Sequence, residues 1–70
     1  MRFRYEVKVG CDDLGRRVTV RYRLQSSGFS DVIGILETCD ERVFGIRDRT
    51  GTLRTIERSD VVAAKIVEQP

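Results

Sequence analysis

The segment Arg16-Arg17-Val18-Thr19-Val20-Arg21-Tyr22-Arg23-Leu24 alternates polar and apolar side chains from its second residue onward. A period of two is the pattern of a β-strand that buries one face and exposes the other. We therefore predict a strand here, and it is the clearest one in the sequence. The side chains predicted to face the core are Val18, Val20, Tyr22 and Leu24, and those predicted to face solvent are Arg17, Thr19, Arg21 and Arg23.

The residues before this strand predict a turn and one more strand. Asp12-Asp13-Leu14-Gly15 is typical of a tight turn, in which Gly15 is free to take a positive φ. Arg2–Val9 alternates with the same period of two, so we predict an additional N-terminal strand there. Its apolar face would carry Phe3, Tyr5, Val7 and Val9.

The run Asp31–Thr38 is apolar on both faces. Gly34 in its middle predicts a bend or bulge of the kind that closes a small barrel. Ile33 and Ile35 lie on the face opposite to the other apolar residues of the run, so only one of the two sets can face the core. Either the N-terminal strand covers Ile33 and Ile35, or these two residues form an exposed docking surface.

The next two predicted strands form a hairpin. Val43–Asp48 and Thr52–Arg58 are separated by Arg49-Thr50-Gly51, in which we expect Gly51 to take the left-handed conformation. Leu53 and Ile56 are three positions apart, so strict alternation fails and we predict a bulge in the second strand. The side chains predicted to face the core are Phe44, Ile46 and Ile56.

The last part of the chain completes the predicted fold. Ser59 and Asp60 are helix-capping residues and predict a short helical turn through Val61–Ala64, with a last strand at Lys65–Glu68. The fold class predicted is all-β: a small SH3-like five-stranded barrel with an additional N-terminal strand and one short helical turn before the last strand. The predicted organisation is an extra strand over 1–11, the barrel domain over 12–68, and the start of a linker to a missing C-terminal domain at 69–70.

Composition narrows the function. The chain has 70 residues, 13 Lys and Arg against 11 Asp and Glu, a formal net charge of +2, and no His. The commonest general base and metal ligand is thus absent, and we predict no catalytic, cofactor-binding or metal-binding residue in this chain. Cys11 and Cys39 are predicted to be isolated thiols, each a small half-buried side chain, which favours a reducing, cytoplasmic location. The longest apolar run, Val61–Ala64, is too short to span a membrane, so we expect no membrane partner.

Basic residues are concentrated in the first third of the sequence. Arg17, Arg21 and Arg23 form a candidate basic surface that could neutralise the phosphates of a nucleic acid, with Phe29 as an exposed aromatic side chain. The other interpretation is a solvated face whose arginines pair with carboxylates across the strands. The acidic partners would then be Glu37, Glu57 or Asp48.

Four segments carry a family resemblance. They are Leu14-Gly15-Arg16-Arg17-Val18-Thr19-Val20-Arg21-Tyr22-Arg23-Leu24, Asp31-Val32-Ile33-Gly34-Ile35-Leu36, Thr50-Gly51, and Arg58-Ser59-Asp60-Val61-Val62-Ala63-Ala64-Lys65. Together they resemble the N-terminal SH3-like domain of actinobacterial GNAT-superfamily N-acetyltransferases of the N-acetylglutamate synthase-like or histone acetyltransferase-like type. The resemblance implies a non-catalytic accessory domain whose partner is its own C-terminal acetyltransferase domain. That missing domain would bind acetyl-CoA and transfer the acetyl group to an amine.

A second segment has the spacing of a cofactor loop. Gln25-Ser26-Ser27-Gly28-Phe29-Ser30 places Gln and Gly as in the pyrophosphate-binding loop of GNAT enzymes. That loop uses the N-terminus of a helix to bind phosphate, whereas a β-rich run follows here. We therefore predict no cofactor bound by this chain. Two functions remain: the accessory domain, and a small nucleic-acid-binding barrel that uses its arginine-rich face.

Overall fold

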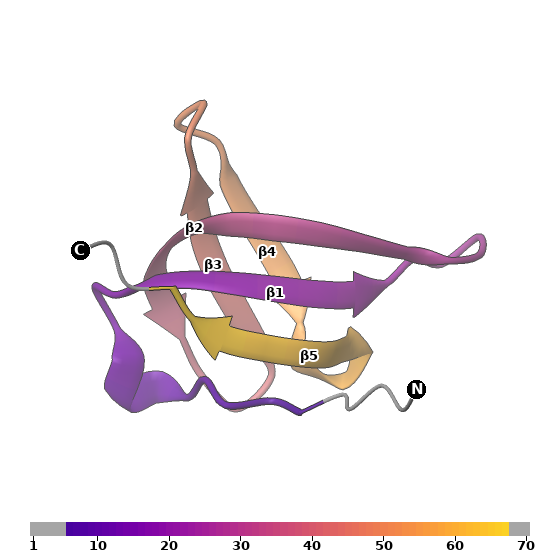
Figure 1. The fold of residues 1–70 in the computed structure, drawn as a ribbon, viewed down its shortest axis with the longest axis horizontal. Helices are drawn as coiled ribbons and strands as arrows, with labels where there is room; N and C mark the ends of the chain where they lie inside the picture. The colour runs from indigo at the N-terminus through magenta and orange to yellow at the C-terminus, as the bar shows by residue number, and fades with distance from the viewer. Residues whose placement is uncertain (1–5, 68–70) are drawn as a thin grey trace.

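The computed structural model describes residues 6–67 as one five-stranded antiparallel sheet with the strand order β4-β3-β2-β1-β5 (Figure 1). Two short 3-10 turns are the only helical elements in this part of the chain. The fold is therefore all-β, as predicted, and its small size and topology agree with an SH3-like or Sm-like barrel. The elements are η1 (Cys11–Asp13), β1 (Arg17–Arg23), β2 (Phe29–Cys39), β3 (Val43–Asp48), β4 (Leu53–Glu57), η2 (Arg58–Asp60) and β5 (Val61–Ile66).

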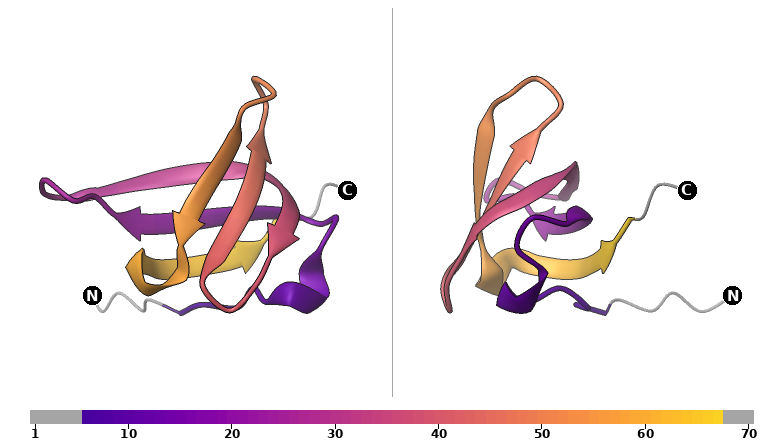
Figure 2. Two further views of the ribbon diagram at one scale, coloured as in Figure 1. Left: turned by 180° about the vertical axis from the view of Figure 1, so that it is seen from behind. Right: turned by 90° about the vertical axis from the view of Figure 1, so that its left-hand side faces the viewer.

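The central strand β2 bends and so belongs to both halves of the barrel. Its residues from Phe29 to Ile35 pair with β1, and its residues from Gly34 onward pair with β3. The β3–β4 hairpin therefore crosses the layer formed by β1, β5 and the first half of β2 (Figure 2). A β-carbon built on Gly34 would lie 2.1 Å from the carbonyl oxygen of Arg47. Only glycine fits between β2 and β3 at this position, and the register irregularity of β2 lies between Leu36 and Thr38, two residues beyond the bend or bulge predicted at Gly34.

The space enclosed by the bent sheet is filled by apolar side chains. The predicted inward positions in β1 and β3 are confirmed, and Ile56 in β4 is buried as well. Leu24 is 39% exposed, contrary to prediction, because β1 ends at Arg23 and Leu24 lies in the following loop. The buried residues are Val9, Val18, Val20, Val32, Leu36, Phe44, Ile46, Ile56 and Ala64.

Two local predictions were wrong. The β3–β4 pairing runs without interruption from Val43↔Glu57 to Arg47↔Leu53, so β4 has no bulge. Leu53 is exposed because it follows the simple alternation of the strand and lies on its outer face. The helical turn ends at Asp60, and Val61 already begins β5. Pairing with β1 favours the extended conformation there, which β-branched residues such as Val61 adopt readily.

The N-terminal segment runs beside β5, and residues 1–5 and 68–70, which include part of the predicted extra strand and the predicted linker, lie outside the described residues. Val7 forms a single parallel bridge to Ala64, and the amide of Lys8 donates to the carbonyl oxygen of Ala64 over 2.8 Å (Figure 1). Val7 is 49% exposed whereas Val9 is buried, so these two side chains do not share one environment.

The prediction of isolated thiols was wrong, because Cys11 and Cys39 form a disulfide across a sequence separation of 28. The tight turn before β1 brings Cys11 to the end of β2, where Cys39 lies. Alternation along a single strand carries no information about this contact between distant segments.

Candidate functional site

The outer face of β2 carries an exposed apolar row. Ile33 is 49% exposed and Ile35 is 39% exposed. Within the described residues, the N-terminal segment lies beside β5 and not over β2, so the predicted covering of Ile33 and Ile35 does not involve residues 6–9. Across the strands, Ile35 is paired with Arg17 on one side and with Arg47 on the other, and Arg47 is paired with Leu53. Leu53 is 40% exposed, which extends the apolar surface onto β4.

An ion pair borders this apolar surface. Arg47 donates through Nε and Nη2 to the two carboxylate oxygens of Glu37, over 3.1 and 2.9 Å. Its Nη1 also donates to the carbonyl oxygen of Gly51 over 3.0 Å. The hydrogen bonds from Arg47 hold the pKa of Glu37 below its ordinary value. The Arg47 guanidinium is thereby fixed beside Ile35, which gives the apolar surface an ordered polar border.

The candidate basic surface lies on the outer face of β1, as predicted. Arg17, Arg21 and Arg23 are all exposed there. Arg21 donates to both carboxylate oxygens of Asp31, over 2.9 and 3.2 Å, and these hydrogen bonds lower the pKa of Asp31. Within residues 6–67, two of the predicted acidic partners pair with other arginines, Glu37 with Arg47 and Asp48 with Arg54. Arg17 and Arg23 have no ion-pair partner within residues 6–67.

Phe29 lies at the far end of the same face. It is 53% exposed and is the cross-strand neighbour of Arg23. An exposed ring next to a guanidinium is one way to stack a base and bind its phosphate. The sequence placed Phe29 at a loop tip, whereas the structure makes it the first residue of β2. Phe29 and Arg23 are thus held in register by the strand pairing.

A cleft of about 470 Å³ opens where β3 diverges from β2. The residues of β2 before Gly34 have no partner on β3, so this edge of β2 faces the tip of the β3–β4 hairpin. Asp48 at the hairpin accepts hydrogen bonds from the Thr50 hydroxyl and from Arg54, at 2.6 and 3.0 Å. These two hydrogen bonds, together with those from the backbone amides of Thr50 and Thr52, lower the pKa of Asp48 to about 2. The cleft is lined by Arg17, Tyr22, Ser30, Asp31, Val32, Ile33, Asp48, Arg49, Thr50 and Arg54.

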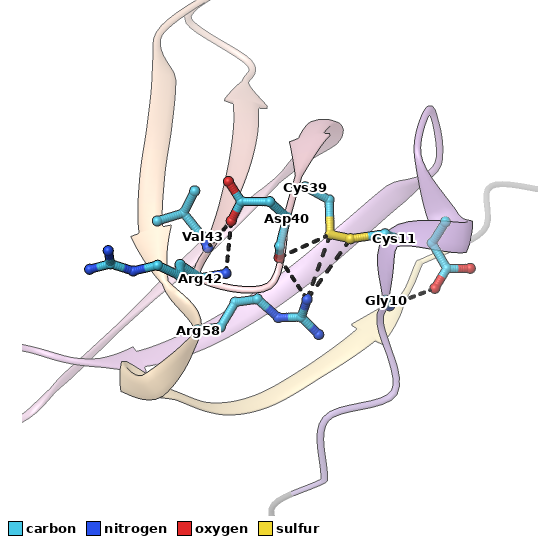
Figure 3. Close-up of a disulfide and its surroundings, with 8 residues drawn as sticks. Gly10, Cys11, Cys39, Asp40, Arg42, Val43 and Arg58 are labelled. Carbon is cyan, nitrogen blue, oxygen red and sulfur yellow. Dashed lines mark hydrogen bonds between the residues drawn. A yellow bond between two sulfur atoms is a disulfide. The ribbon is translucent and has the colours of Figure 1, made fainter.

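The disulfide lies at the opposite end of β2, next to Arg58 of η2 (Figure 3). The Arg58 Nη1 lies 3.9 Å from each of the two sulfur atoms and donates to the carbonyl oxygen of Asp40 over 2.8 Å. The carbon at the centre of the guanidinium lies 4.6 Å from the centre of the Phe44 ring. Arg58 is therefore held between the core and the disulfide.

Sequence reasoning missed several of these residues. Leu53 was assigned to a bulge. If strict alternation had been applied from the buried Ile56, Leu53 would have been placed on the outer face. Arg49 and Arg54 reach the cleft only because the hairpin folds back over β2, and no sequence signal predicts that approach. The same is true of Arg58 and the disulfide. The residues predicted as a docking pair and as a basic trio lie as neighbours on one outer face, with Arg17 opposite Ile35.

A metal site and a membrane-spanning helix are both absent from the residues that the structure describes. No group of three or more Cys, Asp or Glu side chains in residues 6–67 is arranged to hold a metal ion. Over the same residues, none of the helical elements has the length and apolar character needed to cross a bilayer.

A small, strongly bent five-stranded sheet with only 3-10 turns defines the class of Sm-like and SH3-like β-barrel domains. The family model described as the Rv0428c N-terminal Sm-like domain matches residues 12–65, which is most of the chain. The chain belongs to this family. No curated protein and no solved structure matches it.

Proposed function

We propose that this chain is a non-catalytic N-terminal accessory domain of a GNAT N-acetyltransferase and that it docks on the acetyltransferase domain. The observation that carries the proposal is the apolar row of Ile33, Ile35 and Leu53 on the outer face of the sheet, each about two-fifths to one-half exposed. Clustered apolar side chains on a small soluble domain favour a protein partner. The description of the matching family as N-terminal supports an arrangement in which another domain follows.

The geometry of the chain exit supports the same arrangement. The amide of Val67 donates to the carbonyl oxygen of Arg17 over 2.8 Å, and Arg17 is the cross-strand neighbour of Ile35. Val67, the last described residue before such a domain, therefore lies about 10 Å, or two strand spacings, from Ile35. A short connection is enough to bring that domain onto the apolar row.

Acetyl-CoA chemistry would belong to the other domain. The loop with the cofactor-like spacing leads from Gly28 directly into β2, so it offers no helix N-terminus to a pyrophosphate. The residues of this loop do not fit the pyrophosphate of acetyl-CoA, and no step of acetyl transfer is assigned to them.

The first test is the open reading frame downstream of residue 70 together with a docking variant in the full-length protein. Ile33→Asp should separate the two domains and enlarge the radius of gyration measured by small-angle scattering. Val7→Asp is the matched control, because Val7 has the same exposed fraction of 49% but lies away from β2. A reading frame without an acetyltransferase domain, or an unchanged radius for Ile33→Asp, would contradict the proposal.

A second candidate function is nucleic-acid binding, favoured by the exposed Phe29 beside Arg23. Binding of single-stranded RNA or DNA through this end of the face should weaken steeply with salt, because phosphate contacts release counterions. Phe29→Ala should weaken binding at every salt concentration, whereas Arg23→Gln should also reduce the slope against salt by about one. Absence of binding at low ionic strength would eliminate this function.

A further inference from the structure

The disulfide can be reached from solvent. Cys11 is exposed and Cys39 is half-buried. The Sγ of Cys39 lies 3.8 Å from the carbonyl oxygen of Asp40. Because Cys11 is the more exposed of the two residues, we expect a small thiol to attack its sulfur, with Cys39 as the leaving group.

Arg58 supplies the positive charge that such a leaving group needs. Its Nη1 lies 3.9 Å from both sulfur atoms, and the hydrogen bond to Asp40 and the contact with the Phe44 ring fix it there (Figure 3). The carboxylate of Asp40 accepts the backbone amides of Arg42 and Val43, and these hydrogen bonds, with a smaller effect of the Arg58 charge, lower its pKa. A cation held beside a sulfur favours the thiolate over the thiol and speeds its departure.

The disulfide also anchors the segment of residues 6–10 that covers the edge of β5. This segment is otherwise held by two backbone hydrogen bonds to Ala64, by the buried side chain of Val9, and by the turn in which Asp13 accepts the amide of Gly10. The strand pairings of the main sheet are made without these residues, although Val9 also packs in the hydrophobic core. Breaking the disulfide would thus remove the cross-link that holds this segment, through Cys11, to the end of β2.

We propose that Cys11–Cys39 is a thiol–disulfide exchange site for a low-molecular-weight thiol, and that its reduction releases residues 6–10 from the edge of β5. The thiolate of the small molecule attacks Sγ of Cys11, the bond between Cys11 and Cys39 breaks, and Cys39 leaves as a thiolate beside Arg58. A second small thiolate then attacks the small molecule's sulfur in the mixed disulfide, so that the small-molecule disulfide forms and Cys11 leaves as a thiolate. Two electrons pass to the protein, and the two protons of the thiols end on the two cysteines.

The first experiment measures the rate at which reduced glutathione opens the disulfide of the oxidised chain, by acid quenching and mass spectrometry. Arg58→Gln should slow the reaction about three- to tenfold, because the leaving thiolate loses its cation. Arg58→Lys should restore most of the rate. Arg42→Gln is the matched control: it removes the same charge from the neighbouring turn without a contact to either sulfur, and it should leave the rate within about twofold.

A variant that merely loosened the fold would be reduced faster, so slowing by Arg58→Gln cannot come from destabilisation. An unchanged or increased rate for Arg58→Gln would overturn the role of Arg58 and the exchange site with it.

The second experiment measures hydrogen exchange of individual amides in the oxidised and reduced chains. On reduction, the amides of Lys8 and Ala64 should lose at least about tenfold in protection, while those of Val20 in β1 and Val32 in β2 keep theirs. Equal protection of Lys8 and Ala64 in both forms would refute release of the segment. Loss of protection throughout the sheet would show that reduction unfolds the domain, and it would refute the proposal as well.

Discussion

Replacement of Gly34 by alanine tests the bend of β2 on which the barrel and the outer face depend. The new β-carbon would lie 2.1 Å from the carbonyl oxygen and 2.8 Å from the carbonyl carbon of Arg47, and both are backbone atoms that no rotamer change can move. Relief requires β3 to move away from β2 by about 1 Å, since overpacked cores respond by backbone shifts that cost about 1–3 kcal/mol. Weakening the pairing of Gly34 with Asp48 adds about 1 kcal/mol.

We therefore expect Gly34→Ala to lower the free energy of unfolding by about 3 kcal/mol. A domain of this size has a total stability of about 4–10 kcal/mol, so the loss is a large share of it. The thermal midpoint should fall by about 12–24 °C, measured by circular dichroism, because 1 kcal/mol corresponds to about 4–8 °C in a domain of this length.

The matched control is Gly10→Ala. Gly10 has a φ of −141°, which any residue adopts, and a β-carbon there would meet nothing within 4 Å. The control should be neutral or slightly stabilising, because alanine restricts the unfolded chain. If Gly34→Ala unfolded within about 0.5 kcal/mol of the unsubstituted chain, the reasoning from close approach would be refuted, since that is the range of ordinary surface changes.

Two more measurements bear on the disulfide and on the β3–β4 hairpin. In the chain-entropy model, the separation of 28 between Cys11 and Cys39 makes the disulfide worth about 3.6 kcal/mol, so the Cys11→Ser/Cys39→Ser variant should lose about that much in urea unfolding; a loss below about 1 kcal/mol would show that the cross-link does not restrict the unfolded chain. The pKa of Asp48 is about 2 in the fold against an ordinary 3.8, so its contribution to stability is present above about pH 4 and is lost as the pH falls to 2. In the Asp48→Asn variant, the thermal midpoint should therefore fall less between about pH 4 and pH 2 than it does in the unsubstituted chain. An equal difference between the two midpoints at pH 6 and at pH 2 would contradict this prediction.

Much of the fold could be predicted from alternation alone. The alternation predicted which side chains of β1 and β3 are buried, because in a strand with one buried face every second residue is apolar. These side chains are Val18, Val20, Phe44 and Ile46. The bend at Gly34 was also predictable, since a glycine inside an apolar run indicates close approach of another strand.

The rest depends on contacts between distant segments. Leu53 was misassigned because the alternation pattern expects polar residues on the outer face of a strand. Its exposure on that face is what makes Leu53 part of the candidate docking surface. The disulfide, the approach of Arg58 to it, and the arginines at the cleft depend on how the β3–β4 hairpin and the N-terminal turn fold back on β2. Alternation fixes which way a side chain points but not which distant side chain it meets.

The unequal edges of the sheet limit how copies of this chain could associate. Residues 6–8 occupy the edge of β5, whereas β4, at the other edge, has no strand beside it within residues 6–67. A sheet with both edges open can add copies at each edge and grow into a fibre. A sheet with one covered edge can pair only through its open edge, with the same edge of a second copy. Edge-to-edge pairing through β4 would therefore stop at two copies related by a twofold axis.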